Sequence, residues 1–216
     1  MNIIHCIGNS HVNIFKGGNV IMEGNDTIPL FKTHYIGPII AYNFYNHHYP
    51  KALEYIQTNV NKDVDYIMFI VGEVDCRWHI PKQAEMRHEP VFELVDECLE
   101  RYFKSFIDLK NLGYNLIGWG GHPSTIGGHD DDVHKPVYGN CFERNIISKY
   151  WSGSLRQKCI THGIPFTSLV DDLIDESGLT KMEYFIDYCH LKSSMVMDMV
   201  IKQLEQIISG LTPPVL

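Results

Sequence analysis

The chain has 216 residues, of which 44% are hydrophobic and 20% are charged, and its formal net charge is −8. This composition fits one globular protein with a sizeable core and excludes a disordered or fibrous chain. The acidic charge and the scattered basic residues argue against a nucleic-acid partner.

The location of the protein is expected to be cytoplasmic, with no membrane partner. The longest apolar runs are too short to span a bilayer, and Met1 leads directly into an apolar segment without the basic region of a signal peptide. The six cysteines show no CxxC spacing, which favours free thiols in a reducing compartment.

Four short apolar segments, rich in β-branched or aromatic residues, predict buried strands. They cover residues 2–7, 65–71, 114–119 and 164–170. Runs that are apolar on both faces are typical of strands in parallel sheets.

Helix-like segments lie between or after these strands, with proline near two starts and glycine after two ends. They cover residues 38–45, 90–112, 140–162 and 193–208. This alternation predicts an α/β protein: a three-layer α/β/α sandwich with a mostly parallel central sheet, flavodoxin-like in architecture. We find no repeat or linker and assign one domain, residues 1–216, with a loose tail at 212–216.

The most polar motifs follow the predicted strands. They are Gly8-Asn9-Ser10-His11, "GEVDCRWH" from Gly72 to His79, "GGHPST" from Gly120 to Thr125 and, further on, "DYCHL" from Asp187 to Leu191. Because ligands of open α/β sheets bind at the carboxyl ends of the strands, we expect these motifs to form one site.

Ser10, His190 and Asp187 are the candidate catalytic residues. A serine nucleophile needs a base, and the base needs an orienting group. Asp187 and His190 are three residues apart, so one turn of backbone puts both side chains on one side. Taken singly, Ser10 could be a helix cap, Asp187 a turn residue and His190 a surface histidine.

Together these blocks resemble those of the SGNH, or GDSL-like, hydrolase superfamily, in order and approximate spacing over nearly the whole chain. The resemblance implies the SGNH hydrolase fold, with Ser10 as nucleophile and Asp187 and His190 as the DxxH block. It also implies that the amide of Gly37, in "HYIGP", helps to form the oxyanion hole. Asn9 stands where the family usually has aspartate.

The third family block departs from its pattern. It has the form GxND, but here it is Gly72-Glu73-Val74-Asp75, so Val74 replaces the asparagine that donates to the oxyanion. Loss of one such donor typically lowers the rate by about 10²–10³. We expect Asp75 and Arg77 to share a face of an extended segment, with Asp75 orienting Arg77 toward the oxyanion or the substrate; alternatively, the pair only braces the loop.

Other histidines also lie in polar segments. His122 follows two glycines that let the backbone approach a ligand, and we expect it to contact substrate, although loop histidines are usually only solvated. The cluster from His129 to His134 could suggest a metal, but an acidic, glycine-flanked loop is more simply solvated, so we expect neither a metal nor a cofactor.

The function expected is that of a serine esterase or O-acyltransferase, a carboxylic ester hydrolase in class. It would remove or transfer a small acyl group, such as acetyl, on a small-molecule or glycan ester. The carbohydrate substrate rests on the resemblance and on aromatic residues such as Tyr35 near polar strand ends. Two alternatives stay open: a weak or inactive SGNH-like glycan-binding protein, because of Val74, and a metal-dependent hydrolase. The sequence leaves the oligomeric state undetermined.

Overall fold

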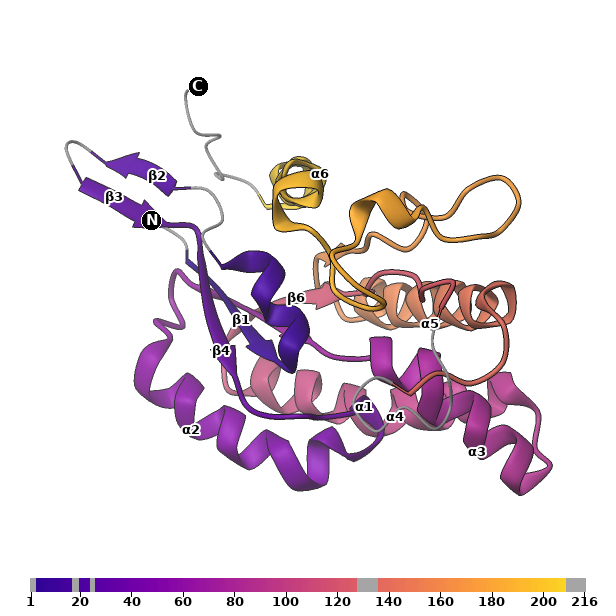
Figure 1. Ribbon diagram of the computed structural model, residues 1–216. Coiled ribbons are helices and arrows are strands. Elements are labelled where there is room, and N and C mark those ends of the chain that lie inside the picture. Colours follow the sequence, from indigo (N-terminus) through magenta and orange to yellow (C-terminus); the bar gives the residue numbers. More distant parts are fainter. Residues whose placement is uncertain (1–2, 17–19, 24–25, 128–135, 209–216) are drawn as a thin grey trace.

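A five-stranded parallel sheet forms the centre of the protein (Figure 1). The computed structural model describes residues 3–16, 20–23, 26–127 and 136–208. Every pair of neighbouring strands in this sheet is parallel, and their order is β4-β1-β5-β6-β7. The strands are β1 (Ile4–Gly8), β4 (Phe31–Tyr35), β5 (Tyr66–Ile70), β6 (Asn115–Trp119) and β7 (Phe166–Thr167).

The two faces of the sheet are both buried, as the alternation along β5 shows. Ile67 and Phe69 belong to one hydrophobic cluster, whereas Met68 and Ile70 belong to a second. Because successive side chains of a strand point to opposite faces, the clusters lie on opposite sides of the sheet. The predicted three-layer α/β/α architecture is therefore confirmed.

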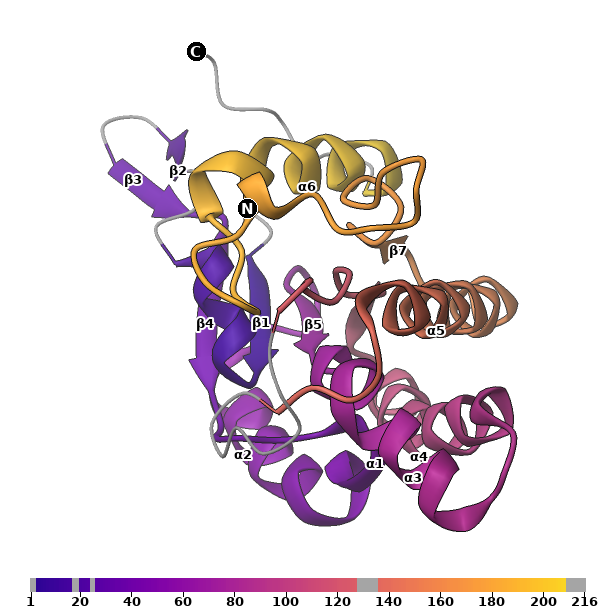
Figure 2. The same ribbon diagram turned by 45° about the vertical axis from the view of Figure 1, so that its right-hand side comes forward.

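Helices on opposite faces cover these two clusters (Figure 2). The larger cluster is covered by α1 (Ala41–Asn43), α2 (Tyr49–Asn59), α4 (Val91–Asn111) and α5 (Cys141–Thr161). The other face is covered by the 3₁₀-helix Ser10–Phe15 and by α6 (Ser193–Ile207). Three of the predicted helices, those at 90–112, 140–162 and 193–208, agree with α4, α5 and α6 to within one or two residues.

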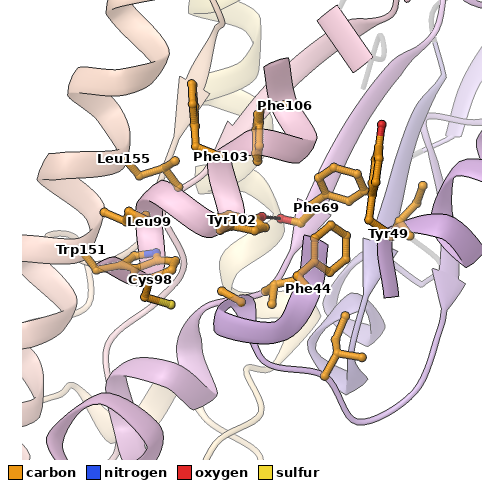
Figure 3. Packing of buried hydrophobic residues seen from close by; sticks show 14 of the residues in the cluster. Phe44, Tyr49, Phe69, Cys98, Leu99, Tyr102, Phe103, Phe106, Trp151 and Leu155 are labelled. Carbon is orange, nitrogen blue, oxygen red and sulfur yellow. Dashed lines mark hydrogen bonds between the residues drawn. The ribbon is translucent and has the colours of Figure 1, made fainter. Parts of the chain in front are cut away.

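Aromatic side chains fill the larger cluster (Figure 3). Phe69 of β5 meets Phe44 and Phe106 edge to face, with ring centroids 4.8 Å and 5.7 Å away. Tyr102 of α4 packs against Phe44 and donates its buried hydroxyl to the carbonyl oxygen of Phe69 at 3.4 Å. Large aromatic rings in such pairs contribute strongly to core stability. They fix α4 against the strand whose carboxyl end carries Gly72 and Glu73.

Several elements were missed by the sequence analysis. Strand β4 lies at an edge of the sheet, and its residues are mostly not buried, so it does not give an apolar run. The hairpin β2 (Val20–Glu23) and β3 (Asp26–Pro29) was also missed. The segment 38–45 begins its helix only at Ala41 and continues through a π-helix, Phe44–His48, into α2.

The "GEVDCRWH" motif is helical rather than extended. Residues Asp75–His79 form a π-helix that leads directly into α3 (Ile80–Arg87). Proline at the second position of α3 is compatible with a helix start, but here the helix continues from the preceding turn. The helical conformation determines which partners Asp75 and Arg77 contact.

None of the helices in the described ranges combines the length and the apolarity that a membrane crossing requires. The predicted tail at 212–216 lies outside the described residues.

Candidate active site

Ser10 stands at the carboxyl end of β1, where the strand turns into a 3₁₀-helix. Gly8 is the last residue of β1, and a Cβ on it would come within 2.1 Å of the carbonyl oxygen of Ile70. Only glycine fits here, because β5 approaches so closely. Asn9 then caps the 3₁₀-helix, accepting a hydrogen bond from the amide of His11 at 3.1 Å. Ser10 follows as its first residue.

Asn9 has a second function that aspartate could not perform. Its side-chain nitrogen donates to the carbonyl oxygen of Ile39 at 3.2 Å, and Asn9 is only 3% exposed. An ionised aspartate offers acceptors only. The asparagine therefore ties the Ser10 turn to the segment 38–40 across from it.

Ser10, His190 and Asp187 form a continuous hydrogen-bonded row. The Oγ of Ser10 lies 2.9 Å from Nε2 of His190, and Nδ1 of His190 lies 2.9 Å from Oδ2 of Asp187. With Nδ1–H donating to the carboxylate, Nε2 is left as the acceptor for the serine hydroxyl. Ser10 and His190 are 180 positions apart in the sequence. They lie in hydrogen-bond contact, with Asp187 on the other side of the ring, as expected.

The loop before α6 holds the His190–Asp187 pair in place. Oδ1 of Asp187 accepts hydrogen bonds from the amides of Cys189 and His190, both at 2.9 Å. These bonds stabilise the turn formed by residues 187–190. Phe185 and Leu191 form an isolated antiparallel bridge at the base of the loop. In Figure 2 this loop extends from α6 toward the carboxyl end of β1. His190 is thus oriented by backbone contacts.

Backbone donors are available beside Ser10. Gly37 follows β4 with a φ of +119°, a conformation that a side chain would strain, and a Cβ there would meet nothing within 4 Å. Its neighbour Ile36 donates its amide to the carbonyl oxygen of Gly8 at 3.0 Å, which keeps the two strand ends together. Among the described residues, the amides of Ser10 and Gly37 have no hydrogen-bond acceptor. Both can therefore donate to a ligand.

A pocket of about 320 Å³ opens at Ser10. Its lining includes Ser10, His190 and Cys189 together with the apolar residues Pro38, Ile39, Ile40 and Val74. Tyr35 at its rim is 55% exposed and presents an aromatic ring to solvent. The full lining consists of Asn9, Ser10, His11, Tyr35, Pro38, Ile39, Ile40, Val74, Arg77, Pro136, Cys189 and His190.

The expected pairing of Asp75 with Arg77 is wrong. Arg77 instead donates from Nε to Oε1 of Glu73 at 2.7 Å and from Nη1 to the carbonyl oxygen of Pro136. The cause is the helical backbone: in a helix the residue four positions earlier lies on the same face, whereas the residue two earlier does not. Arg77 does line the pocket beside Ser10, as expected.

Asp75 is turned away from the pocket. Its fully buried carboxyl accepts from the amides of Ala41 at 2.7 Å and Tyr42 at 3.2 Å, and the thiol of Cys98 lies 3.6 Å away. Burial raises the pKa of Asp75 to about 7, against the lowering effect of the two amides. Asp75 is therefore a cap for α1, which follows the pocket wall, and does not bind substrate directly in this geometry.

His122 lies beneath the pocket surface and does not line it. It is 2% exposed; its Nδ1 lies 3.1 Å from the carbonyl oxygen of Pro123 and its Nε2 lies 3.2 Å from Nδ1 of His11. The expected substrate contact is therefore wrong, because both ring nitrogens are occupied. His11 in turn places Nε2 2.9 Å from Oε2 of Glu73. Glu73 and His11 were not predicted as site residues, and their positions inside two strand-end motifs are the only signal in the sequence that indicates them.

The one group of potential metal ligands in the described residues coincides with this site. Asp187, Cys189 and His190 each offer a ligand atom, and these atoms lie within 4.8 Å of one another. The thiol of Cys189 lies 3.5 Å from Nδ1 of His190. Soft sulfur and imidazole ligands suit zinc, but an ion here would compete with Asp187 for the same ring nitrogen. The histidine cluster from His129 to His134 lies outside the described residues.

Comparison with known proteins supports the fold. No family model matches the sequence, and no curated protein is significantly similar to it. Solved structures do match. An acetyl xylan esterase aligns over 96% of this chain and 100% of its own, with a TM-score of 0.56 and 15% identity. A GDSL-like lipase from Bacteroides thetaiotaomicron aligns over 95% and 88%, with a TM-score of 0.57 and 13% identity.

A third solved structure is Est24, a carbohydrate acetylesterase from Sinorhizobium meliloti. It aligns over 94% of this chain and 99% of its own, with a TM-score of 0.52 and 14% identity. The protein therefore has the fold of the GDSL-like esterases and lipases, as the resemblance of its motifs implied.

Proposed function

We propose that the protein is a serine hydrolase that cleaves a carboxylic ester through Ser10, His190 and Asp187. The observation that carries the proposal is the hydrogen-bonded row from Ser10 Oγ to His190 to Asp187, at the carboxyl end of a parallel sheet. A serine beside a base, and a base beside an orienting carboxylate, is the arrangement that activates a hydroxyl for attack.

The steps follow from the positions of the atoms. Ser10 Oγ attacks the ester carbonyl while Nε2 of His190 takes its proton. Asp187 accepts from Nδ1 and stabilises the imidazolium that forms. His190 then gives the proton to the leaving alcohol, and water or another alcohol resolves the acyl-enzyme. The amides of Ser10 and Gly37, which have no acceptor among the described residues, would donate to the oxyanion.

A small acyl group on a carbohydrate is the substrate that the pocket favours. Ile39, Ile40 and Val74 line the same pocket as Ser10 and give it an apolar part, which suits a short acyl chain. The exposed ring of Tyr35 at the rim offers a face for a sugar ring. Two of the structurally similar proteins are an acetyl xylan esterase and a carbohydrate acetylesterase. Acyl transfer to a second alcohol would use the same residues.

A glycan-binding protein without turnover is the second candidate. Val74 lines the pocket, where a hydrocarbon side chain can donate no hydrogen bond to an oxyanion. Such a protein would bind acetylated sugars at Tyr35 and the pocket but would not cleave them.

The test is turnover of p-nitrophenyl acetate and of an acetylated xylo-oligosaccharide, each with and without a chelator. We expect turnover that Ser10→Ala abolishes and the chelator leaves unchanged. Sugar binding without turnover would support the second candidate, whereas loss of turnover with chelator would indicate a metal-dependent hydrolase and contradict the proposal.

A further inference from the structure

The thiol of Cys189 lies in the catalytic pocket, and the proposed reaction makes no use of it. Cys189 lines the same pocket as Ser10, and its Sγ lies 3.5 Å from Nδ1 of His190. The residue is 3% exposed, and the pocket of about 320 Å³ is the opening that it lines. A soft sulfur atom therefore lies beside the ring nitrogen that faces Asp187.

Three residues of one short loop bring possible metal ligands together. Nδ1 of His190 lies 2.9 Å and 3.2 Å from the two carboxylate oxygens of Asp187. One ligand atom from each of Asp187, Cys189 and His190 lies within 4.8 Å of the other two. Around a tetrahedral zinc ion, neighbouring ligand atoms are about 3.4–3.6 Å apart. The distance of 3.5 Å between Nδ1 and Sγ already has this value.

The other two distances require a local rearrangement. Sγ lies 4.0 Å from Nε2 as well as 3.5 Å from Nδ1, so the sulfur lies beside the ring and not in line with Nδ1. The thiol has to turn toward the ion, and the carboxylate has to move away from Nδ1 by about 0.5 Å. A site that rearranges on binding has a lower affinity than a preformed one. We therefore expect micromolar binding.

The set of donors selects a soft divalent cation. Thiolate and imidazole are common zinc ligands, whereas magnesium and calcium prefer oxygen ligands alone. A thiolate and a carboxylate together balance the charge of one divalent ion. Three protein ligands also leave a fourth tetrahedral position, which a water molecule can fill. Zinc is the common biological cation that fits this combination.

We propose that Asp187, Cys189 and His190 form an inhibitory zinc site. The ligand atoms are a carboxylate oxygen of Asp187, Sγ of Cys189 and Nδ1 of His190. Binding of the ion stands on the geometry of the loop alone, whereas inhibition rests on the proposed function. Zinc is in this case a regulator that stops the reaction, and not a cofactor that supports it.

Zinc stops the reaction by changing the tautomer of His190. The ion takes the electron pair of Nδ1, so the single proton of the neutral ring moves to Nε2, and the thiol proton of Cys189 leaves to water. Nε2 then carries a hydrogen and cannot accept the proton of Ser10. Asp187 binds the ion and no longer orients the ring. No covalent bond forms, so a chelator reverses the inhibition.

Cobalt(II) absorption tests the site independently of activity. Metal-free protein without an affinity tag is titrated with Co²⁺, which takes zinc ligands and gives a near-ultraviolet charge-transfer band when a thiolate binds it. We expect the band in the wild type and in Ser10→Ala, its loss in Cys189→Ala, and its displacement by zinc. Cys141→Ala removes another buried cysteine and should keep the band. No band in the wild type, or an unchanged band in Cys189→Ala, would overturn the inference.

Kinetics test the consequence of binding. Turnover of p-nitrophenyl acetate is measured at increasing zinc concentration, and each rate is divided by the rate of the same metal-free variant. We expect micromolar zinc to inhibit the wild type and the same concentration of magnesium or calcium to have no effect. Cys189→Ala should raise the zinc concentration for half-inhibition by at least about 10²-fold, because even outer-shell partners of metal ligands typically contribute 10–100-fold to affinity.

The outcomes separate this inference from the proposed function. Inhibition that persists unchanged in Cys189→Ala would mean that zinc acts elsewhere, and it would overturn the inference. Ester turnover by a wild type that shows no cobalt band would also overturn the inference and leave the proposed function intact. A wild type that shows the band but turns over no ester would contradict the proposed function, while the binding site would stand.

Discussion

Two histidine–carboxylate pairs lie side by side in this protein, and they differ in what surrounds them. In each pair the ring nitrogen is 2.9 Å from the carboxylate oxygen. The side chains of His190 and Asp187 are 25% and 32% exposed, whereas those of His11 and Glu73 are both 4% exposed. The free nitrogen of His190 faces a hydroxyl, while that of His11 faces another imidazole.

This difference separates a half-buried pair that contacts a hydroxyl from a buried pair that contacts a second imidazole. The hydroxyl contact is the one that the proposed function uses, because Ser10 Oγ can donate to Nε2 of His190. Between His11 and His122, the tautomers of the two rings decide which nitrogen donates.

The largest effect is expected for Asp187, the carboxylate of the half-buried pair. Asp187→Asn should lower kcat by about 10⁴-fold, because an amide no longer fixes the tautomer of His190 or stabilises its imidazolium. Its oxygen can still accept from the amides of Cys189 and His190, so the loop should keep its shape and the Tm should change little. Asp198→Asn, at an exposed position of α6, is the matched control and should keep full activity. A fully active Asp187→Asn would show that the pair of His190 and Asp187 is not catalytic.

Removing Arg77 from its buried ion pair with Glu73 should lower the stability of the protein. Arg77→Ala leaves Glu73 with His11 as its only partner among the contacts described, and breaking a buried ion pair typically costs about 3–5 kcal/mol. Arg101→Ala breaks an ion pair with Glu97 in which the arginine is 40% exposed, and it should cost at most about 1 kcal/mol. Urea unfolding of both variants measures the two losses. Similar small losses would mean that Glu73 does not depend on Arg77.

The pH dependence of stability tests the raised pKa of Asp75, the buried carboxyl that caps α1. Its pKa is about 7 in the folded protein, above the usual 3.8, so the folded state keeps a proton that the unfolded state has already lost. Stability is therefore lost as the pH rises from about 4 to about 7. Relative to the wild type, Asp75→Asn should become more stable over that interval, by up to about 4 kcal/mol. A constant difference in unfolding free energy between pH 4 and pH 7 would contradict the raised pKa.

The smallest effect is expected at Asn9, in the turn that carries Ser10 and His11. Asn9→Asp loses the donor to the carbonyl oxygen of Ile39 and places two acceptors together, which should cost about 1–3 kcal/mol. Asn59→Asp is the control: Asn59 also donates to a backbone carbonyl, but at an exposed position, and it should cost about 0.5 kcal/mol or less. Thermal unfolding measures both. An Asn9→Asp protein as stable as the wild type would mean that the turn does not need its amide.

The pair of His190 and Asp187 could be predicted from the sequence because its geometry is local. Asp187 and His190 are three residues apart in a loop that their own backbone contacts shape, so their spacing is informative. The parallel sheet was predictable for a similar reason, since each buried strand is a short apolar run. Strand β4 was not, because an edge strand needs few apolar residues.

The buried contacts among His11, His122, Glu73 and Arg77 could not be predicted from the sequence. They depend on the backbone conformation of segments that are far apart along the chain. The pairing of Arg77 changes from Asp75 to Glu73 once the segment is helical. The contact between His11 and His122 joins residues 111 positions apart, on separate strand-end motifs, and no local pattern indicates it.

The most direct test of the central claim is covalent labelling with a fluorophosphonate, followed by mapping of the modified peptide. The account predicts one label per chain, on Ser10, and none in a folded Ser10→Ala variant. A label on any other residue, or an active wild type that resists labelling, would contradict the assignment of Ser10 as the nucleophile.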